Sequence, residues 1–278
     1  MDRSQSAGTL GLGFRFRCSV EAVKRGEVQG MASFAMIHGA GDVGWYWHMV
    51  EQELRLRGHE SVAPDLPVED DSAGLPEYAR TVVEAIGDRD DVVVVAQSFG
   101  GFTAPLVADQ VPVRTLVLVT AMIPAPGEPP NDWVANTGFD RVMREQTQED
   151  IFYHDVPRDV ADQARGKSRG QSDTPGHSPW PLRAWPDVPT RFILCTEDRF
   201  FPPDFMRRVV ADRLGITPDE IASGHCAALS HPKEQRRSQG LRALGQLHRD
   251  LEADSIPRSS ADRRSDAEHP ARRKRVVL

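Results

Sequence analysis

The chain has 278 residues, of which 39% are hydrophobic and 27% are charged, values that are ordinary for a globular protein and exclude collagen, fibrous classes and wholesale disorder. No apolar run approaches the ~18 residues that a membrane-spanning helix requires, so we expect no membrane partner. The formal net charge is −7, and because each end carries +2, residues 31–251 carry −11, which is unfavourable for binding nucleic acid.

The ends of the chain differ in composition from its middle. Residues 1–30 form an N-terminal extension with two interpretations. The codons for Gly26-Glu27-Val28 can contain a bacterial ribosome-binding site. In the first interpretation Met31 is therefore the true start, and residues 1–30 are a translated leader that does not belong to the fold. Alternatively, the alternation over residues 14–18 forms a genuine first strand. Residues 252–278 are rich in Arg, Ser, Asp and Ala with little to bury, and we expect a disordered tail there.

Cysteine usage indicates the compartment. The three cysteines, Cys18, Cys195 and Cys226, are odd in number and lack C-x-x-C spacing, so they predict neither a disulfide framework nor a zinc site. The N-terminus also has no basic-then-apolar secretion signal. We therefore expect a cytoplasmic protein.

The middle of the chain alternates short β-branched runs with helix-length amphipathic segments. Continuous apolar runs are typical of strands covered by helices on both faces, so this order predicts an α/β fold with a doubly wound, mostly parallel sheet. We expect a kink at Pro105, which falls inside one of the expected helices. The expected strands are residues 34–37, 61–63, 92–96, 113–119 and 191–195, with a weaker one at 219–222, and the expected helices lie near 45–57, 76–87, 99–110, 203–213 and 232–250.

The alternation is interrupted once, between Met122 and Pro189. Pro-rich stretches open and close the interruption, and residues 131–166 between them are typical of short helices. An excursion of about 65 residues is too long for a plain connection and is usually functional. The sequence thus predicts one α/β domain over residues 31–251 with a helical cap inserted at about 123–189.

The strongest chemical signal is a serine at a strand-to-helix junction. Ser98 follows the apolar run at 92–96 and precedes Gly100-Gly101. A tight turn there lifts Oγ out of the sheet, and the helix N-terminus directs N–H groups at developing negative charge, the arrangement of a nucleophile elbow. The alternative is an ordinary N-cap serine.

A nucleophilic serine needs a base and an oriented acid further along the chain. His225 follows the weak strand at 219–222, and Asp198 follows the strand at 191–195. Asp198 would hold the imidazole of His225 in its productive tautomer, and His225 would accept the Ser98 proton. Glu197 is the rival acid. No carboxylate follows the strand at 113–119, which favours Asp198.

The turn after the first expected strand reads His38-Gly39-Ala40-Gly41. Small residues let a backbone N–H approach the substrate oxygen, so the N–H groups of Ala40 and Phe99 would form an oxyanion hole. His38 is interpreted as a packed histidine under the turn, with a second catalytic base as the alternative. His154, Asp155 and His177 lack further ligands at zinc-like spacing, so we expect solvated or capping roles, and no metal or cofactor.

In combination, these motifs resemble the α/β-hydrolase superfamily, and within it the branch of plant methyl-ester hydrolases and hydroxynitrile lyases with their bacterial relatives. The resemblance covers about residues 31–250 and implies a serine hydrolase in which Ser98, Asp198 and His225 form the triad. The residues that carry it are those three, His38-Gly39-Ala40, Gly44-Trp45-Tyr46-Trp47, Gly58-His59, Pro64-Asp65-Leu66, Gly224 and Leu229-Ser230-His231-Pro232.

Two departures bear on the activity. The similar lyases have a Thr after the first motif's His and a Lys after the catalytic His, where this chain has Gly39 and Cys226. Without the Lys charge a leaving cyanide loses its stabilisation, so hydrolysis is favoured. Four residues, besides Phe99, are candidates for an apolar substrate pocket, with plain packing of the cap as the alternative. They are Met122, Trp133, Trp180 and Trp185.

The sequence therefore predicts a serine hydrolase that cleaves a small, uncharged carboxylic ester through an acyl-enzyme on Ser98. A small-molecule ester is the expected partner, and the oligomeric state is left open. The first alternative is a cofactor-independent lyase or C–C bond hydrolase on the same triad. The second is a non-catalytic binding protein on a hydrolase scaffold.

Overall fold

The computed structural model describes residues 31–139 and 147–230. The predictions for residues 1–30, for a helix at 232–250 and for a tail at 252–278 lie outside these ranges. Every expected strand is present, as β1 (Ser33–Ile37), β2 (Glu60–Val62), β3 (Val92–Gln97), β4 (Thr115–Val119), β5 (Thr190–Cys195) and β6 (Asp219–Ile221).

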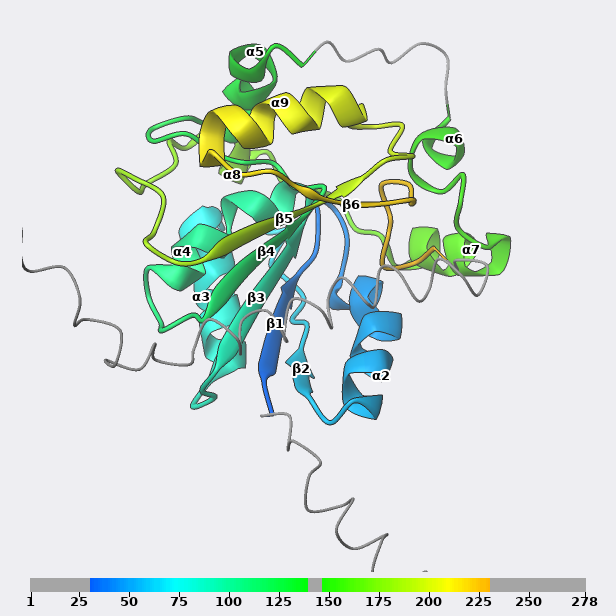
Figure 1. Ribbon diagram of the computed structural model, residues 1–278, viewed down its shortest axis with the longest axis horizontal. Helices are drawn as coiled ribbons and strands as arrows, with labels where there is room; N and C mark the ends of the chain where they lie inside the picture. Colours follow the sequence, from blue (N-terminus) through cyan, green and yellow to red (C-terminus); the bar gives the residue numbers. More distant parts are fainter. Residues whose placement is uncertain (1–30, 140–146, 231–278) are drawn as a thin grey trace, which may run out of the picture.

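These strands form one six-stranded sheet in the order β2-β1-β3-β4-β5-β6. Each pair of neighbouring strands in the described part of the chain is parallel, which confirms the predicted topology. Because parallel strands end at the same edge, the loops after β1, β3, β4, β5 and β6 converge there (Figure 1).

The helices divide between the body of the domain and the segment that joins β4 to β5. The body contains η1 (Gly44–Trp47), α2 (His48–Leu56), α3 (Leu75–Ile86), η2 (Ser98–Phe102), α4 (Ala104–Ala108) and α9 (Pro203–Leu214). Residues 120–189, here named the β4–β5 segment, contain η3 (Pro130–Asp132), α5 (Trp133–Thr137), α6 (Gln148–Phe152), α7 (Arg158–Lys167) and α8 (Thr174–His177).

Two hydrophobic clusters hold the layers together, one on each face of the sheet. Val92 and Val94 pack with α3, α4 and α9 on one face, while Val93 and Val95 pack with α2 and α7 on the other (Figure 1). Side chains alternate between faces with a period of two, so a continuous valine run contributes to both clusters. All six residues of β3 are buried, as expected for a strand covered on both sides.

The segment after β3 differs from the single kinked helix predicted over residues 99–110. It consists of the 3-10 helix η2 (Ser98–Phe102) followed by the short α4 (Ala104–Ala108). Pro105 lies in the first turn of α4, where the missing N–H has no intrahelical partner to lose. The chain therefore accommodates Pro105 by starting a new helix there.

No helix among the described residues is long and apolar enough to span a membrane.

Candidate active site

Ser98 lies at the junction between β3 and η2 with a positive φ of 51°. A non-glycine residue in this region is strained by about 1–3 kcal/mol and persists only where the surroundings enforce it. The next two glycines show how: a Cβ on Gly100 would lie 2.9 Å from the His38 carbonyl oxygen, and one on Gly101 would lie 2.0 Å from the Met122 carbonyl oxygen. The backbones after β1 and β4 thus press against the turn and leave room only for glycine.

His225 connects Ser98 to Asp198. Its Nε2 lies 3.1 Å from Ser98 Oγ, and its Nδ1 lies 2.8 Å from Asp198 Oδ2. Asp198 and His225 are 5% and 3% exposed, so this contact is shielded from water. The three sequence-predicted residues, which are 27 to 127 positions apart in the chain, are therefore brought into one hydrogen-bonded series at the carboxyl edge of the sheet.

The charge state of Asp198 fixes the direction of these bonds. Burial alone would raise the Asp198 pKa, but the charge of His225 and hydrogen bonds from His225, Thr120 and the backbone lower it, so the pKa lies below its ordinary value. A carboxylate only accepts, hence His225 Nδ1 carries the hydrogen, and in the neutral imidazole Nε2 is then the acceptor that faces Ser98 Oγ. This is the tautomer required of a general base.

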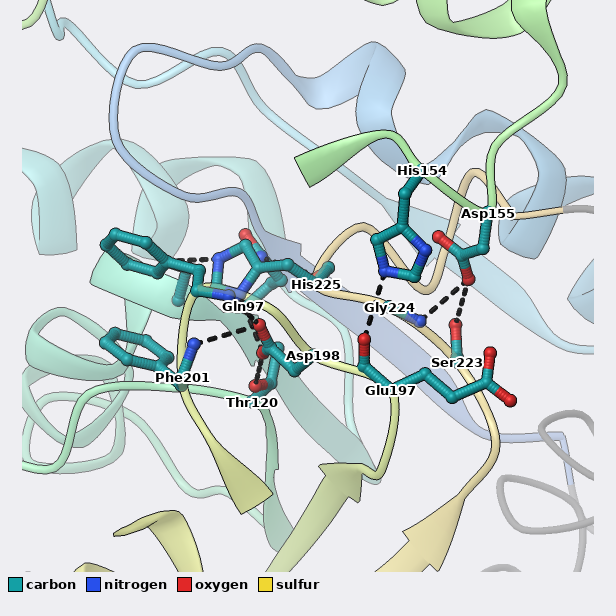
Figure 2. A network of polar contacts seen from close by, with 12 residues as sticks. Gln97, Thr120, His154, Asp155, Glu197, Asp198, Phe201, Ser223, Gly224 and His225 are labelled. Atoms are coloured by element: carbon teal, nitrogen blue, oxygen red, sulfur yellow. Dashed lines mark hydrogen bonds and ion pairs between the residues drawn. The ribbon is translucent and has the colours of Figure 1, made fainter. Parts of the chain in front are cut away.

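Asp198 accepts hydrogen bonds at both oxygens. Oδ1 accepts from the N–H groups of Phe200 at 2.8 Å and Phe201 at 2.9 Å, and Oδ2 accepts from Thr120 Oγ1 at 2.5 Å as well as from His225 (Figure 2). Thr120 directly follows β4, the position where the sequence offers no carboxylate. Sequence reasoning missed its role, because a threonine at the end of one strand gives no sign of its partner after the neighbouring strand.

The rival acid, Glu197, has an exposed side chain, and Figure 2 shows that its carboxylate points away from His225. Glu197 adjoins the site through its main chain instead. Its N–H donates to the Ser223 carbonyl at 3.0 Å, which ties the loop after β5 to the loop after β6.

His38 is a packed, neutral residue beneath the turn after β1. Its Nε2 accepts from the Leu66 N–H at 3.1 Å, so Nδ1 carries the hydrogen and donates to the Gly39 carbonyl at 2.9 Å. The side chain is 1% exposed, and burial lowers its pKa to about 4. Both ring nitrogens are hydrogen-bonded to the backbone, which agrees with a packed histidine. Neither nitrogen is therefore available to act as a second catalytic base.

The predicted oxyanion donors, Ala40 and Phe99, belong to segments that adjoin Ser98. A Cβ on Gly39 would lie 3.2 Å from Ser98 Cβ, so the Gly39-Ala40 turn adjoins the serine. Phe99 is the second residue of η2, and the first N–H groups of a helix have no partner within it. The segments that carry Ala40 and Phe99 therefore both adjoin Ser98, and the role of their N–H groups as oxyanion donors stays a prediction.

The β4–β5 segment makes hydrogen bonds to the backbone N–H and carbonyl groups of Gly41, in the loop after Ala40. The Gly41 N–H donates to Gln171 Oε1 at 3.0 Å, and its carbonyl accepts from Ser168 Oγ at 2.9 Å and from the Arg169 N–H at 2.8 Å. Gly41 has a φ of 65°, so a side chain there would be strained as well. No sequence pattern indicated this contact.

The tryptophans predicted to line a pocket pack in or against the hydrophobic core. Trp133 and Trp180 are 0% and 1% exposed, and their indole N–H groups donate to the carbonyls of Ile123 and Phe102. Trp185 is partly buried against the same cluster. This placement corresponds to the packing alternative for the three residues, whereas partly buried Met122 directly adjoins the serine, its N–H donating to the Ser98 carbonyl at 2.9 Å.

Three other aromatic rings surround the imidazole of His225. The rings of Phe152, Phe200 and Phe201 lie 5.3, 5.0 and 5.4 Å from it, each in an edge-on arrangement. They come from α6 and from the loop that carries Asp198. The environment of the imidazole is therefore apolar on several sides, and sequence reasoning did not single these residues out.

Cys226, immediately after His225, is buried, and burial raises its thiol pKa well above the ordinary value. It thus places no charge beside the imidazole. Among the described residues, no cluster of three or more His, Cys, Asp or Glu side chains could hold a metal ion.

The sequence of this chain is similar to those of known proteins. A family model described as "Alpha/beta hydrolase family" matches residues 34–237. The chain is similar to norfluorocurarine synthase 1 from Strychnos sp., with 23% identity over 73% of this chain and 92% of that protein. It is also similar to methylesterase 7 from Arabidopsis thaliana, with 32% identity over 42% of this chain and about half, 48%, of the relative.

Among solved structures, polyneuridine aldehyde esterase superposes with a TM-score of 0.64 at 20% identity, covering 80% of this chain and 100% of that one. At this identity the likeness shows a shared fold.

Proposed function

The chain belongs to the α/β-hydrolase family, and we propose that this hydrolase is a serine carboxylesterase that cleaves small, uncharged esters through an acyl-enzyme on Ser98. The observation that carries the proposal is the hydrogen-bonded series from Ser98 Oγ through both nitrogens of His225 to Asp198. Similarity to a plant methylesterase supports the same class of reaction.

In the first half of the reaction, Ser98 Oγ attacks the ester carbonyl carbon while its proton passes to His225 Nε2. The N–H groups of Ala40 and Phe99 donate to the oxyanion of the tetrahedral intermediate. Asp198 stabilises the imidazolium through Nδ1–H. When the intermediate collapses, the carbon–alkoxy bond breaks and the Nε2 proton transfers to the leaving alkoxide, releasing an alcohol.

In the second half, water attacks the acyl carbon and gives its proton to His225 Nε2. The oxyanion forms again at the same two N–H groups. Collapse breaks the bond to Ser98 Oγ, which recovers its proton from Nε2, and a carboxylic acid leaves. Ser98 and His225 return to their starting states, so no cofactor is consumed.

An uncharged substrate is favoured by the surroundings of the site. The rings of Phe152 and Phe200 are apolar, and residues 31–251 carry a net charge of −11. Arg199, the cation next to the acid, has its guanidinium bound to the Asp150 carbonyl at 3.1 Å and is exposed. We assign Met122 and Phe99, which adjoin Ser98, as the first residues that an acyl or alkyl group would contact.

Cyanohydrin cleavage on the same triad is the alternative that the family resemblance raises. A leaving cyanide requires a positive charge near the catalytic histidine. The neutral, buried thiol of Cys226 supplies none, and Gly39 supplies no hydroxyl. Both features favour hydrolysis over lyase activity. A non-catalytic binding role is disfavoured because the tautomer and the strained serine turn have no purpose in simple binding.

The proposal is tested by assaying p-nitrophenyl esters of two to eight carbons beside aliphatic and aromatic cyanohydrins. We expect ester hydrolysis, and a loss of kcat of about 10⁴-fold or more in Ser98→Ala. Ser72→Ala, at an exposed surface serine, is the matched control and should retain full activity. Cyanohydrin cleavage without ester hydrolysis, or equal activity in Ser98→Ala, would overturn the proposal.

A further inference from the structure

Two adjacent residues of the β4–β5 segment, His154 and Asp155, contact the loops that carry His225 and Asp198 (Figure 2). They lie between α6 (Gln148–Phe152) and α7 (Arg158–Lys167). From sequence alone they are interpreted as solvated or capping residues. A role for them in catalysis rests on the proposed function, because it concerns the same Ser98, His225 and Asp198.

Asp155 binds the loop of the catalytic base. Its Oδ2 accepts from the Gly224 N–H at 2.7 Å and from Ser223 Oγ at 3.2 Å. Gly224 immediately precedes His225, so this carboxylate oxygen fixes the peptide group from which the imidazole projects. Ser223 Oγ also lies 2.9 Å from Ser230 Oγ, which connects the contact to the following turn.

His154 binds the loop of the acid. Its Nε2 lies 3.0 Å from the Glu197 carbonyl oxygen. A carbonyl only accepts, so Nε2 carries the hydrogen and donates. Glu197 immediately precedes Asp198. Neighbouring side chains of one dipeptide therefore bind the main chain directly before each of the two residues that must remain 2.8 Å apart.

The approach of the dipeptide depends on the glycine at position 224. A Cβ there would lie 2.5 Å from Asp155 Oδ1 and 2.7 Å from His154 Nε2. Gly224 therefore makes room for both side chains. Asp155 Oδ1 is buried and has no hydrogen-bond partner among the described residues, so the contact of this carboxylate with the loop runs through Oδ2 alone.

We propose that Asp155 and His154 are positioning residues that hold the His225 and Asp198 loops at the separation required for proton transfer from Ser98. The Thr196 N–H donates to Ile221 at the end of β6, and the Glu197 N–H donates to Ser223 in the loop after it, so the two loops are also joined at their bases. His154 and Asp155 add hydrogen bonds directly before Asp198 and His225, and these bonds connect both loops to the β4–β5 segment. Because both side chains bind the loops and not Ser98, we expect their contribution to be to turnover.

The test compares Asp155→Ala with Asp155→Asn. An amide oxygen can accept both bonds that Oδ2 accepts, so Asn preserves the contact while removing the charge. We expect Asp155→Ala to lower kcat for a p-nitrophenyl ester by about 10- to 100-fold, as a small misplacement of reacting groups does, with KM nearly unchanged. Asp155→Asn should keep kcat within about threefold of wild type. Equal loss in both variants would contradict positioning through an accepted hydrogen bond.

Thr147→Ala is the matched control for destabilisation of the same region. Thr147 caps α6 through the Asp150 N–H, and its loss costs about 1 kcal/mol, while the hydrogen bonds of its side chain run to Asp150 and to neither loop. We expect a lower melting temperature and wild-type kcat. If kcat falls in both Thr147→Ala and Asp155→Ala in proportion to melting temperature, Asp155 is merely structural and the inference fails.

His154→Ala and His154→Gln provide an independent pair should Asp155→Ala not fold. The Gln amide can donate from the position of Nε2, so it should restore most of the kcat lost in Ala; loss that Gln does not restore would contradict the assignment. Labelling of Ser98 by a fluorophosphonate separates this inference from the proposed function. No labelling of wild type would overturn the function, whereas labelling of Asp155→Ala as fast as wild type would overturn only the positioning role.

Discussion

Replacing Thr120 by Val removes one of the hydrogen bonds to Asp198 while keeping the shape of the side chain. The hydroxyl donates to Asp198 Oδ2 at 2.5 Å, and both residues are buried, at 1% and 5% exposure. A hydrogen bond to a charged group contributes about 1.5–3 kcal/mol. We therefore expect the free energy of unfolding to fall by about 2 kcal/mol at pH 7, which lowers the melting temperature by about 4–8 °C for a domain of this size.

The pH dependence gives this prediction a second readout. Thr120 helps to lower the Asp198 pKa in the folded state, so Val raises that pKa toward its ordinary value of about 3.9. The stabilisation by a depressed carboxyl pKa is fully present above the unfolded-state pKa and is lost as pH falls through the folded-state pKa. The difference between wild type and variant should stay constant from pH 7 to about 5 and shrink below about 4.

Thr103→Val is the control, because it makes the same substitution at a buried threonine. Its hydroxyl has no hydrogen-bond partner among the described residues and is fully buried. Removing an unpaired hydroxyl should be neutral or stabilising. Urea unfolding of both variants across the pH range measures the effect. Equal stability of Thr120→Val and wild type at pH 7, or a difference that is independent of pH down to 3, would refute the role assigned to Thr120.

Three other contacts around the site have measurable consequences. Gly101→Ala should give insoluble or strongly destabilised protein, because its Cβ would lie 2.0 Å from a backbone carbonyl oxygen. Gly166→Ala is the control: it lies in a helix, its Cβ would have no neighbouring atom within 4 Å, and it should raise the free energy of unfolding by about 0.5–1 kcal/mol in thermal unfolding. Gln171→Ala, which frees the Gly41 N–H, should lower kcat by about tenfold in ester hydrolysis with little change in KM, and an unchanged kcat would contradict the proposed oxyanion loop. Burial lowers the pKa of His38 to about 4, so between pH 6.5 and 4 the unfolded chain binds a proton that the folded protein does not, and the folded protein loses stability as the pH falls. His38→Asn should lose less stability than wild type over that window. Parallel pH profiles of the free energy of unfolding would contradict this.

The sheet and its functional edge could be predicted from local patterns. A run such as Val92–Val95 has no polar face and is β-branched throughout, which is typical of a parallel strand covered on both sides, and parallel strands end at the same edge. From that, Ser98, Asp198 and His225 could be expected at one edge, since each follows a strand. The structure brings them within hydrogen-bond distance.

The partners of those residues could not be predicted, because they depend on contacts between distant segments. Thr120 is an ordinary threonine in sequence, and its role arises only because β4 lies beside β5 in the sheet. His154 and Asp155 lie between the short helices α6 and α7, and nothing local in the sequence indicates which loops they contact. Of the kinked helix predicted over 99–110, the interruption near Pro105 is present, but the turn before it is a 3-10 helix and α4 ends at Ala108, details that local propensity does not determine.

The tryptophans illustrate a different limit. Hydrophobicity and size are equally suited to a pocket wall and to a core, and the sequence left both open. In the structure the indole N–H groups of Trp133 and Trp180 bind backbone carbonyls inside the core, a distinction that only three-dimensional neighbours can make.

The covalent step at Ser98 is the central claim, and mass spectrometry after treatment with a fluorophosphonate tests it most directly. We predict one adduct per chain on the wild-type protein, located on the peptide that contains Ser98, and none on Ser98→Ala. An unmodified wild-type protein, or an adduct that persists in Ser98→Ala, would contradict the assignment of Ser98 as the nucleophile.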